Sequence, residues 1–333
     1  MCSFMKIVGL TYDLKTDYQF QEGDPPDANA EFDHPSTVDV IANAIASQGF
    51  QVKKIGNANS LLENINNLGV DIVFNLSEGL YGRNRESQVP ILLEMAGIPF
   101  VGSDALTLGL TLDKIIAKKI FIAEGISTPK FFEIKTMDNL LDSDHLNFPL
   151  IVKPRFEGSS KGLSEKSRVE NMQELRAQAE FIINTYKQPA LVEEFIIGQE
   201  FTVAIVGNDP PEVLPVVQIK IDGSLQLDEK FYTFARISSD RLEYICPAPI
   251  SQELNKKICD LALSSYNVVD CLDFGRIDFR VDNAGNPYVL EINPLPSLST
   301  EDVFCLLAKL KGMSYEQLIG RILNIALTRY GLQ

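Results

Sequence analysis

The sequence predicts a mixed fold that begins as α/β and continues as α+β, divided into more than one domain. At 333 residues the chain is too long for one small hydrophobic core. Strand-like and helix-like segments alternate over residues 6–101, which is typical of an α/β layout. Near the C-terminus, two alternating strand-like runs flank a strong hairpin signal. A hydrophobic content of 45% is enough for ordinary packed domains.

The N-terminal segments fit a doubly wound, Rossmann-like sheet. In order, we expect strand 6–10, helix 33–48, strand 51–55, helix 59–68, strand 71–75, helix 86–96 and strand 98–101. Ser36 or Thr37 is expected to cap the helix over 33–48, and Gly49 to end it. No GxGxxG follows the first strand, which argues against a dinucleotide at the first turn.

A polar loop from Asn75 to Glu86 comes directly after a predicted strand. Open α/β sheets bind ligands at this carboxyl end of their strands, so we expect Glu78, Arg83 and Glu86 to line a cleft. The alternative is that Arg83 and Arg85 pair with Glu78 and Glu86 on the surface. The sequence leaves both interpretations open.

The middle of the chain contains a candidate phosphate-binding loop. It follows, in order, helix 111–123, strand 129–134 and the apolar run 148–152. The last run enters Lys153-Pro154, and the loop 155–162 is rich in glycine and serine. Backbone N–H groups of such a loop can bind phosphate oxygens, with Lys153 as a cation at its base. It is no Walker A loop, because GxxxxGK[ST] is absent. The alternative is an ordinary turn.

An apolar strand over 190–196 then runs into acidic residues. Adenine needs an apolar slot with backbone hydrogen bonds, and ribose hydroxyls need a carboxylate acceptor. Glu193, Glu194, Phe195 and Ile196 suit the first requirement, and Glu200 suits the second. The alternative is an ordinary strand followed by a loop.

The C-terminal hairpin carries the most informative residues. Strand-like runs 274–281 and 287–292 flank a turn, and centring the turn on Ala284-Gly285 places Asp278 opposite Glu291 and Arg276 opposite Asn293. Alternation then puts these four side chains on one face. Facing carboxylates repel, and a divalent cation relieves the repulsion. Two carboxylates with an amide oxygen suit Mg²⁺ bound to phosphates. The alternative is a solvated polar face with an incidental ion pair.

Composition excludes several classes of protein. The net charge of −15 argues against binding nucleic acid or an anionic membrane. Five scattered cysteines without CxxC spacing predict reduced thiols in the cytoplasm, with no disulfide framework or zinc site. His34 and His145 lie in loop-like segments and are expected at the surface. We find no signal peptide and no membrane-spanning run, and expect Met1–Phe4 to be an extension.

A series of motifs, taken in order, resembles the D-alanine–D-alanine ligase family of the ATP-grasp superfamily. The motifs are Asp113-Lys114, Val152-Lys153-Pro154, Glu157-Gly-Ser-Ser160, Val192-Glu-Glu-Phe195, Gly198-Gln-Glu-Phe201, Cys246-Pro-Ala248, Gly275-Arg-Ile-Asp-Phe279 and Leu290-Glu-Ile-Asn293. The likeness runs from about residue 86 to the C-terminus and is looser before it. It implies a three-domain ATP-grasp fold with ATP clamped between two α+β lobes. We expect boundaries at 1–112, 113–196 and 197–333.

The resemblance also implies roles for individual residues. Lys114 and Lys153 would bind ATP phosphates, and Ser159 and Ser160 would sit on a lid loop over an acyl phosphate. Arg276 would stabilise the oxyanion of the tetrahedral intermediate. By the same likeness, adenosine would be held by Glu193, Glu194, Phe195, Ile196 and Glu200, and two Mg²⁺ ions, or Mn²⁺, by Asp278, Glu291 and Asn293.

The sequence departs from the family pattern at the positions that would bind the two substrates. The family's glutamate after the first strand is missing, and a long polar insert to Asp33 offers Glu31 or Asp33 to bind an ammonium group. Arg236 stands for the lysine of the family's lid. Asp302 falls where a serine receives the second substrate's carboxylate, and Ser297 replaces a glycine. An aspartate beside a carboxylate is unfavourable, unless Asp302 instead caps a helix that begins near residue 300.

These observations predict an ATP-dependent carboxylate–amine ligase. It would join small amino acids, or an amino acid and an amine, through an acyl phosphate, as a possible homodimer. One alternative is true D-alanine–D-alanine ligation for the cell wall. Another is an inactive nucleotide-binding module with a regulatory role. The joint presence of Lys114, Lys153, Arg276, Asp278, Glu291 and Asn293 argues against inactivity.

Overall fold

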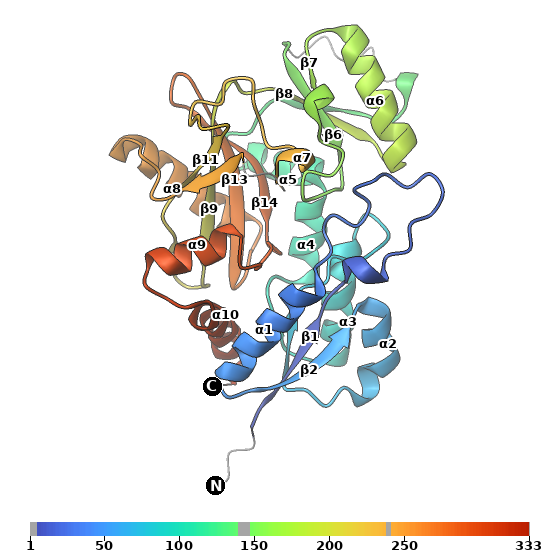
Figure 1. Cartoon of the computed structure of the whole chain (residues 1–333), viewed down its shortest axis with the longest axis vertical. Coiled ribbons are helices and arrows are strands. Elements are labelled where there is room, and N and C mark those ends of the chain that lie inside the picture. Colours follow the sequence, from blue (N-terminus) through green and yellow to red (C-terminus); the bar gives the residue numbers. More distant parts are fainter. Residues whose placement is uncertain (1–4, 139–146, 238–240, 333) are drawn as a thin grey trace.

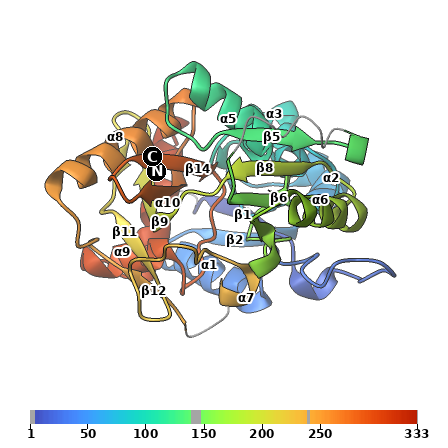
Figure 2. The same cartoon turned by 90° about the horizontal axis from the view of Figure 1, so that it is seen from above.

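The structure is a computed structural model that describes residues 5–138, 147–237 and 241–332. Its strands form three sheets, and Figures 1 and 2 show them in three lobes, with the two later lobes side by side. The predicted combination of α/β and α+β is confirmed. His145 and Met1–Phe4 lie outside the described residues, so their expected positions stay predictions. Within the described ranges, every helix is too short or too polar to cross a bilayer.

The first sheet is parallel and belongs to the N-terminal lobe. Its strand order is β2 (Gln51–Gly56), β1 (Ile7–Thr11), β3 (Ile72–Asn75) and β4 (Phe100–Val101). The helices of this part are α1 (Pro35–Ser47), α2 (Ala58–Asn64), α3 (Gln88–Ala96) and α4 (Ala105–Leu112). The Rossmann-like alternation therefore exists as predicted, with α4 as an additional helix.

The start of α1 corrects one expectation. The N-cap is His34, which is exposed, and Pro35 occupies the first helical position. Ser36 and Thr37 therefore lie inside the first turn and cannot cap the helix. Proline favours this position because its fixed φ suits a helix and its missing N–H would have no partner there. Gly49, with φ of 88°, follows the last turn as predicted.

The central lobe has an antiparallel sheet. Its order is β5 (Phe131–Ile134), β8 (Ala190–Glu194), β6 (Leu150–Pro154) and β7 (Arg168–Val169). Helix α6 (Met172–Tyr186) covers this sheet through Leu175, Ala179 and Ile182, which pack on Val152 and Val192. Helix α5 (Lys114–Ala123) begins at Asp113, whose carboxylate caps it by accepting from the Ile116 amide. Lys153 and the loop after it thus start from the end of a buried strand.

The C-terminal lobe has the largest sheet. Along it lie β12 (Leu242–Ile245), β11 (Val217–Ile221), β9 (Gly198–Val206), β13 (Phe274–Asp282) and β14 (Pro287–Asn293), with β10 (Glu212–Val213) beside β9. The helices are α7 (Phe234–Ile237), α8 (Gln252–Val268), α9 (Val303–Leu310) and α10 (Tyr315–Arg329). Buried apolar residues of α8, including Ile258 and Ala262, pack against the face of the sheet opposite the polar hairpin residues.

The β13–β14 register agrees with the prediction, but for a different reason. Asp278 pairs with Glu291 and Arg276 with Asn293. The loop encloses three residues, Asn283 to Gly285, where two were assumed, because Gly285 donates its amide to the Asp282 carbonyl and Asp282 donates its amide to the Asn286 carbonyl. A bulge at Leu290, between the pairs Phe279–Val289 and Asp278–Glu291, restores the expected register.

The main core crosses the expected domain boundaries. It joins Val8 and Ile41 of the N-terminal lobe to Phe304 and Ile319 of α9 and α10, all at most 1% exposed. Helix α10 packs along α1 at the bottom of Figure 1. The boundaries at 1–112, 113–196 and 197–333 stay predictions, and the first and last lobes share one apolar interior.

The buried carboxylate of Asp273 connects the first and last lobes through an ion pair and hydrogen bonds. Its side chain is fully buried and accepts from Arg329 of α10 at 2.7 and 3.1 Å, from the Gly102 amide at 2.8 Å and from Asn208 at 2.9 Å. Its φ of 65° is unusual outside glycine and is best tolerated by Asp and Asn. One carboxylate therefore links the end of β4, the loop before β13 and the last helix.

We expect Asp273→Ala to lower the free energy of unfolding by about 1–3 kcal/mol, since it removes the buried acceptor of the Gly102 amide and the ion-pair partner of the partly exposed Arg329. Denaturant unfolding followed by circular dichroism measures this change. Asp260→Ala is the control, because Asp260 forms an exposed pair with Lys256 on α8. The control should unfold like the wild type. Equal midpoints for both variants would contradict the role given to Asp273.

Candidate active site

A cavity of about 850 Å³ lies where the three lobes meet, and it collects most of the residues predicted from the sequence. This volume can hold a nucleotide, or another small molecule, together with a substrate. The predicted residues that line it are Glu31, Glu78, Glu86, Lys114, Lys153, Ser159, Ser160, Glu193, Glu194, Phe195, Ile196, Glu200, Arg276, Asp278, Glu291, Asn293, Ser297 and Asp302.

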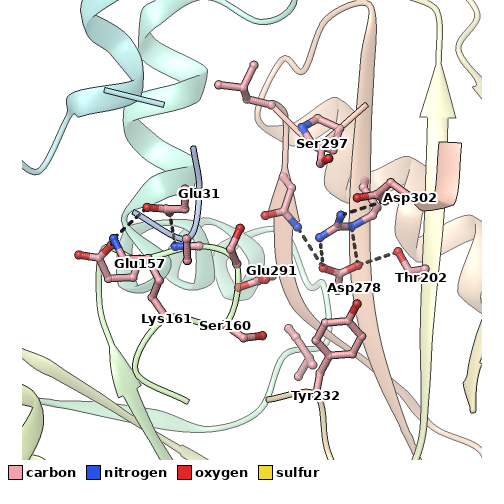
Figure 3. Close-up of a pocket in the computed structure, with 18 of the residues that line it drawn as sticks. Glu31, Glu157, Ser160, Lys161, Thr202, Tyr232, Asp278, Glu291, Ser297 and Asp302 are labelled. Atoms are coloured by element: carbon pink, nitrogen blue, oxygen red, sulfur yellow. Dashed lines mark hydrogen bonds and ion pairs between the residues drawn. The ribbon is translucent and has the colours of Figure 1, made fainter. Parts of the chain in front are cut away.

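Asp278 is held by neighbours on three sides at the centre of the C-terminal sheet. Arg276 donates to it from Nε at 3.1 Å and from Nη2 at 3.0 Å, and Asn293 donates from Nδ2 at 3.0 Å. Thr202 of β9 donates its hydroxyl at 2.6 Å. Figure 3 shows the Thr202 side chain pointing toward the Asp278 carboxylate. The predicted polar face is therefore one connected group.

Glu291 lies opposite Asp278, but a cation from the central lobe balances its charge. Lys114 Nζ is 3.1 Å from Glu291 Oε2. Burial alone would raise the pKa of Glu291, but Lys114 and Lys153 lower it to about 2, so the carboxylate stays ionised. Protein cations thus relieve the repulsion expected between the two carboxylates. The three oxygen-bearing side chains Asp278, Glu291 and Asn293 remain a hard donor set of the kind that Mg²⁺ prefers.

Two buried lysines share one carboxylate behind the cavity wall. Glu193 lies 2.6 Å from Lys153 Nζ and 2.5 Å from Lys118 Nζ, and none of the three side chains is more than 9% exposed. Burial lowers the pKa of Lys118 to about 8, even though Glu193 opposes this shift. Glu193 fixes Lys153 at the cavity wall, and its carboxylate faces the lysines. An isolated Lys153 would be costly to bury without this partner.

The wall near β9 combines an aromatic ring with a carboxylate. Phe195 packs edge-to-face on Phe231 with centroids 5.6 Å apart, and the Arg280 guanidinium lies 4.6 Å from the Phe195 centroid. Arg280 donates to Glu200 at 3.2 Å. Burial raises the pKa of Glu200 to about 7 against the effect of Arg280. With Ile196, this wall offers an apolar slot and a nearby acceptor.

Ser159 and Ser160 form the tip of the loop after β6. Their φ angles are 45° and 55°, in the left-handed region that non-glycine residues rarely occupy. The Lys161 amide donates to the Gly158 carbonyl at 2.9 Å and closes the turn. Within the described residues, neither the amides nor the hydroxyls of the two serines have hydrogen-bond partners, and both serines line the cavity. Adjacent unpaired N–H groups of this kind form an anion-binding concavity.

The N-terminal lobe contributes an acidic group at the other end. The carboxylate oxygens of Glu31, Glu78 and Glu86 lie within 4.8 Å of one another. Burial would raise the pKa of Glu31, but Arg85 at 2.6 Å and Lys161 at 3.1 Å lower it to about 2.

The other two members of this acidic group are different. The side chains of Glu78 and Glu86 have no hydrogen bond or ion pair among the described residues, although Glu86 is only 8% exposed. Burial raises the pKa of Glu86 to about 7, and burial together with Glu86 and Glu31 raises the pKa of Glu78 well above its ordinary value. A cationic substrate group would lower both pKa values and pair with both side chains.

Asp302 combines the two roles that the sequence left open. It is the N-cap of α9 and accepts from the Val303 amide at 2.6 Å. It also lines the cavity, and one of its oxygens lies 3.9 Å from Arg276 Nη1. Burial would lower the pKa of Arg276, but Asp278 and Asp302 raise it, so the guanidinium stays charged. Ser297 lies beside Asp302 in Figure 3.

Two predicted residues lie outside the cavity lining. Arg83 is exposed and pairs with Asp113 at 2.9 Å. It neither lines the cavity nor pairs with Glu78 or Glu86, so both expectations for Arg83 were wrong. Arg236 of α7 pairs with Glu165 at 2.7 Å. Asp113 is a strong alternative partner for Arg83 because it is buried at a helix start and already binds Arg155.

Several residues of the cavity were not predicted. Thr202, Tyr232 and Arg280 line it, and Lys118 supports it from behind. Thr202 faces Asp278 because β9 pairs with β13, a contact between strands far apart in sequence. The only available signal was alternation within β9, and it does not identify the partner strand. Tyr232, whose hydroxyl lies 2.6 Å from that of Tyr244, comes from a loop without periodicity.

Comparison with known proteins agrees with this geometry. The family described as D-ala D-ala ligase C-terminus matches residues 120–324. The chain is 34% identical over 300 residues to the D-alanine–D-alanine ligase of Carboxydothermus hydrogenoformans, covering 87% of this chain and 92% of that protein. It is 39% identical over 259 residues to the uncharacterized protein y4sG of Sinorhizobium fredii, covering 78% and 75% respectively.

A solved structure shares the fold over nearly the whole chain. The D-alanine–D-alanine ligase of Bacillus anthracis, crystallised with ATP, superposes with a TM-score of 0.77 at 24% identity and covers 99% of both chains. The three-sheet architecture around one cavity is therefore shared with that solved structure. Together with the family match and the relatives above 30% identity, this shows that the chain belongs to the D-alanine–D-alanine ligase family of the ATP-grasp superfamily.

Proposed function

We propose that this ADP-forming ATP-grasp ligase activates the carboxylate of a small amino acid as an acyl phosphate and transfers the acyl group to an amine. The observation that carries the proposal is the convergence of three groups in one cavity. These are the serine turn with Lys153, the hairpin residues around Asp278 and Glu291, and the acidic group of the N-terminal lobe. They supply, in turn, a phosphate site, a charge-stabilising site and an ammonium site.

ATP fits the part of the cavity between the central and C-terminal lobes. Lys114 and Lys153 would bind its phosphates, together with the amides of Ser159 and Ser160. Phe195 and Ile196 would form the adenine slot, and Glu200 would accept from the ribose. Glu193 acts on this site through Lys153, which lies 2.6 Å from its carboxylate.

Asp278, Glu291 and Asn293 would hold the Mg²⁺ ions that this family of reactions requires, with Mn²⁺ as a substitute. Bound there, the metal would neutralise charge on the transferring phosphoryl group. Lys114 contacts one oxygen of Glu291, and Arg276 contacts both oxygens of Asp278. When the metal binds, these side chains would share those oxygens with it or move away. The number of ions stays a prediction.

The residues of this chain account for each chemical step. The donor carboxylate attacks the γ-phosphorus and ADP leaves, giving an acyl phosphate. The acceptor amine then attacks the acyl carbon, and phosphate leaves after the amine loses a proton. Arg276, fixed by Asp278, would face the oxyanion that develops between these events. The serine turn would exclude water from the acyl phosphate.

The donor's ammonium group would bind the acidic group. Glu78 and Glu86 are available for it, while Glu31 is already neutralised by Arg85 and Lys161. The acceptor side differs from a site built for D-alanine, because Asp302 rather than a hydroxyl faces Arg276. We therefore favour an acceptor without a free α-carboxylate next to its amine.

True D-alanine–D-alanine ligation is the second candidate. It is supported by the 34% identity to a D-alanine–D-alanine ligase over 92% of that protein. A cytoplasmic location and a homodimer stay predictions for either candidate.

The experiment that tests the proposal measures phosphate release from ATP over a panel of amino acids and amines, with products identified by mass. Release that needs two substrates and gives a condensed product supports the ligase. ATP binding without release under every combination would instead support a nucleotide-binding module.

We expect Glu291→Gln to remove most of the Mg²⁺-dependent turnover while the fold is kept, because an amide is a weaker ligand for Mg²⁺ than a carboxylate. Turnover is measured as a function of Mg²⁺ concentration. Glu253→Gln on α8 is the control, since Glu253 is exposed and pairs with Lys257 on the same helix. Normal activity of Glu291→Gln at limiting Mg²⁺ would rule out the metal site.

We expect Arg276→Ala to lower kcat by about 10²–10³-fold, as for other oxyanion donors, with little change in ATP binding. Single-turnover kinetics and calorimetry separate the two quantities. Arg241→Ala, an exposed arginine paired with Asp222, controls for loss of positive charge. A loss confined to the apparent affinity for ATP contradicts the assigned role.

We expect Asp302→Ser to improve the use of D-alanine as acceptor, because it removes a carboxylate from the acceptor side of the cavity. Serine also caps helices well, so α9 should keep its start. Steady-state kinetics with D-alanine as the sole amino acid compares the wild type with the variant. Efficient D-alanyl-D-alanine formation by the wild type would discard this idea and favour the second candidate.

A further inference from the structure

The insert between β1 and α1, residues 14–33, forms a closed loop that reaches the central lobe. Its two ends meet at the base, where the Lys15 amide donates to the Asp33 carbonyl at 3.0 Å and the Asp33 amide donates to the Asp13 carbonyl at 2.9 Å. Figure 1 shows this loop in dark blue, extending from the N-terminal lobe beneath α6. A surface loop ordered at both its base and its tip has a defined partner.

Asp27 is one of two residues through which the insert contacts the loop after β6. Its Oδ2 accepts from the Gly162 amide at 2.8 Å, and the Tyr186 hydroxyl of α6 donates to the same carboxylate at 2.8 and 2.9 Å. Asp27 is only 5% exposed and does not line the cavity. Gly162 has φ of 75°, and a Cβ there would lie 2.6 Å from Pro154, so this end of the loop is tightly packed.

A second carboxylate of the insert contacts the opposite end of the same loop. Glu31 Oε1 accepts from the Gly158 amide at 2.6 Å, and its Oε2 lies 3.1 Å from Lys161 Nζ. The insert therefore holds the first and the last residue of the segment 158–162. Between them, the amides of Ser159 and Ser160 have no partner among the described residues.

Electrostatics indicates what this arrangement is for. A carboxylate close to bound phosphates is unfavourable, so Asp27 is not there to bind ATP. It occupies an N–H at the end of the loop and leaves the N–H groups at the tip for an anion. Because the strained Ser159 and Ser160 need surrounding contacts to persist, anchoring both ends of the turn also stabilises its left-handed conformation.

We propose that Asp27, acting with Tyr186, is a positioning residue that braces the 158–162 loop over the acyl phosphate. The inference rests on the proposed function and adds to it a residue from the insert, outside the cavity. Its consequence is coupling: with the brace intact, each ATP consumed yields one condensed product. Without it the loop opens more often, water reaches the acyl phosphate, and ATP is hydrolysed without product.

The test compares Asp27→Ala with Asp24→Ala. Asp24 is a matched control, because it also accepts from a tyrosine hydroxyl, that of Tyr18, and from a backbone amide, that of Gln21, but only within the insert. We expect Asp27→Ala to raise the ratio of phosphate released to product formed by about threefold or more and the KM for ATP by about tenfold. Asp24→Ala should leave both values as in the wild type.

Conservative variants keep the proposal testable if Asp27→Ala does not fold. Asp27→Asn retains an acceptor for the Gly162 amide and should restore coupling in part, whereas Tyr186→Phe removes the hydroxyl that donates to Asp27 and should uncouple. A purely structural role would lower kcat in all variants with unchanged coupling and KM. That outcome, or equal effects at Asp24 and Asp27, would overturn the proposal.

A readout independent of catalysis separates this inference from the proposed function. Amide hydrogen exchange of the segment 156–163 should be faster in Asp27→Ala than in the wild type with ATP and Mg²⁺ present, whatever the substrates are. Faster exchange in a chain that makes no condensed product would keep the brace and reject the ligase. Unchanged exchange would reject the brace even if the wild type is an active ligase.

Discussion

The pairing of Asp278 with Glu291 across the β13–β14 hairpin is the constraint on which the rest of the cavity depends. Two ionised carboxylates on adjacent strands are stable only if positive charge reaches both. The sheet itself supplies one cation, Arg276, two residues from Asp278 on the same strand face. The other has to come from elsewhere, and Lys114 at the start of α5 supplies it. The hairpin therefore fixes where the central lobe must place a lysine.

The same principle of shared charge recurs around the cavity. Lys153 and Lys118 lie on either side of Glu193, Arg85 and Lys161 on either side of Glu31, and Arg280 beside Glu200. In each case a charged group is held at the cavity edge by a buried partner that it could not lose without a large cost. Glu78 and Glu86 differ from these groups, since neither side chain has an ion-pair partner within the described part of the chain. These unpaired carboxylates lie at the end of the cavity where we propose that the donor's ammonium group binds.

Features set by neighbouring residues could be predicted from the sequence, and features set by distant ones could not. The hairpin followed from its turn residues and alternation, and the parallel sheet from alternating strands and helices. Thr202 and Arg280 escaped because their positions depend on the β9–β13 pairing, which no local pattern specifies. Arg83 was misplaced for a related reason, since its partner Asp113 lies 30 residues away at a helix start. The N-cap of α1 was missed because proline at the first helical position outweighed two good capping residues that follow it.

The bulge at Leu290 divides β14 into two parts. Odd-numbered residues face the core on the side of the turn, and even-numbered residues face it on the other side. On the side of the turn, Val289 faces the core beside Phe279, and on the other side Glu291 faces the cavity beside Asp278. Because Val289 pairs with Phe279 and Glu291 pairs with Asp278, removing the unpaired Leu290 would leave a regular ladder, with Glu291 and Asn293 still on the cavity face. Changes of length in the turn around Asn283 lie beyond this point and leave the polar pairs in register. The tip of the hairpin is therefore a place where evolution, or a protein engineer, can insert sequence such as a label or a peptide, whereas an insertion or deletion within the paired run 291–293 would move the residues beyond it to the other face.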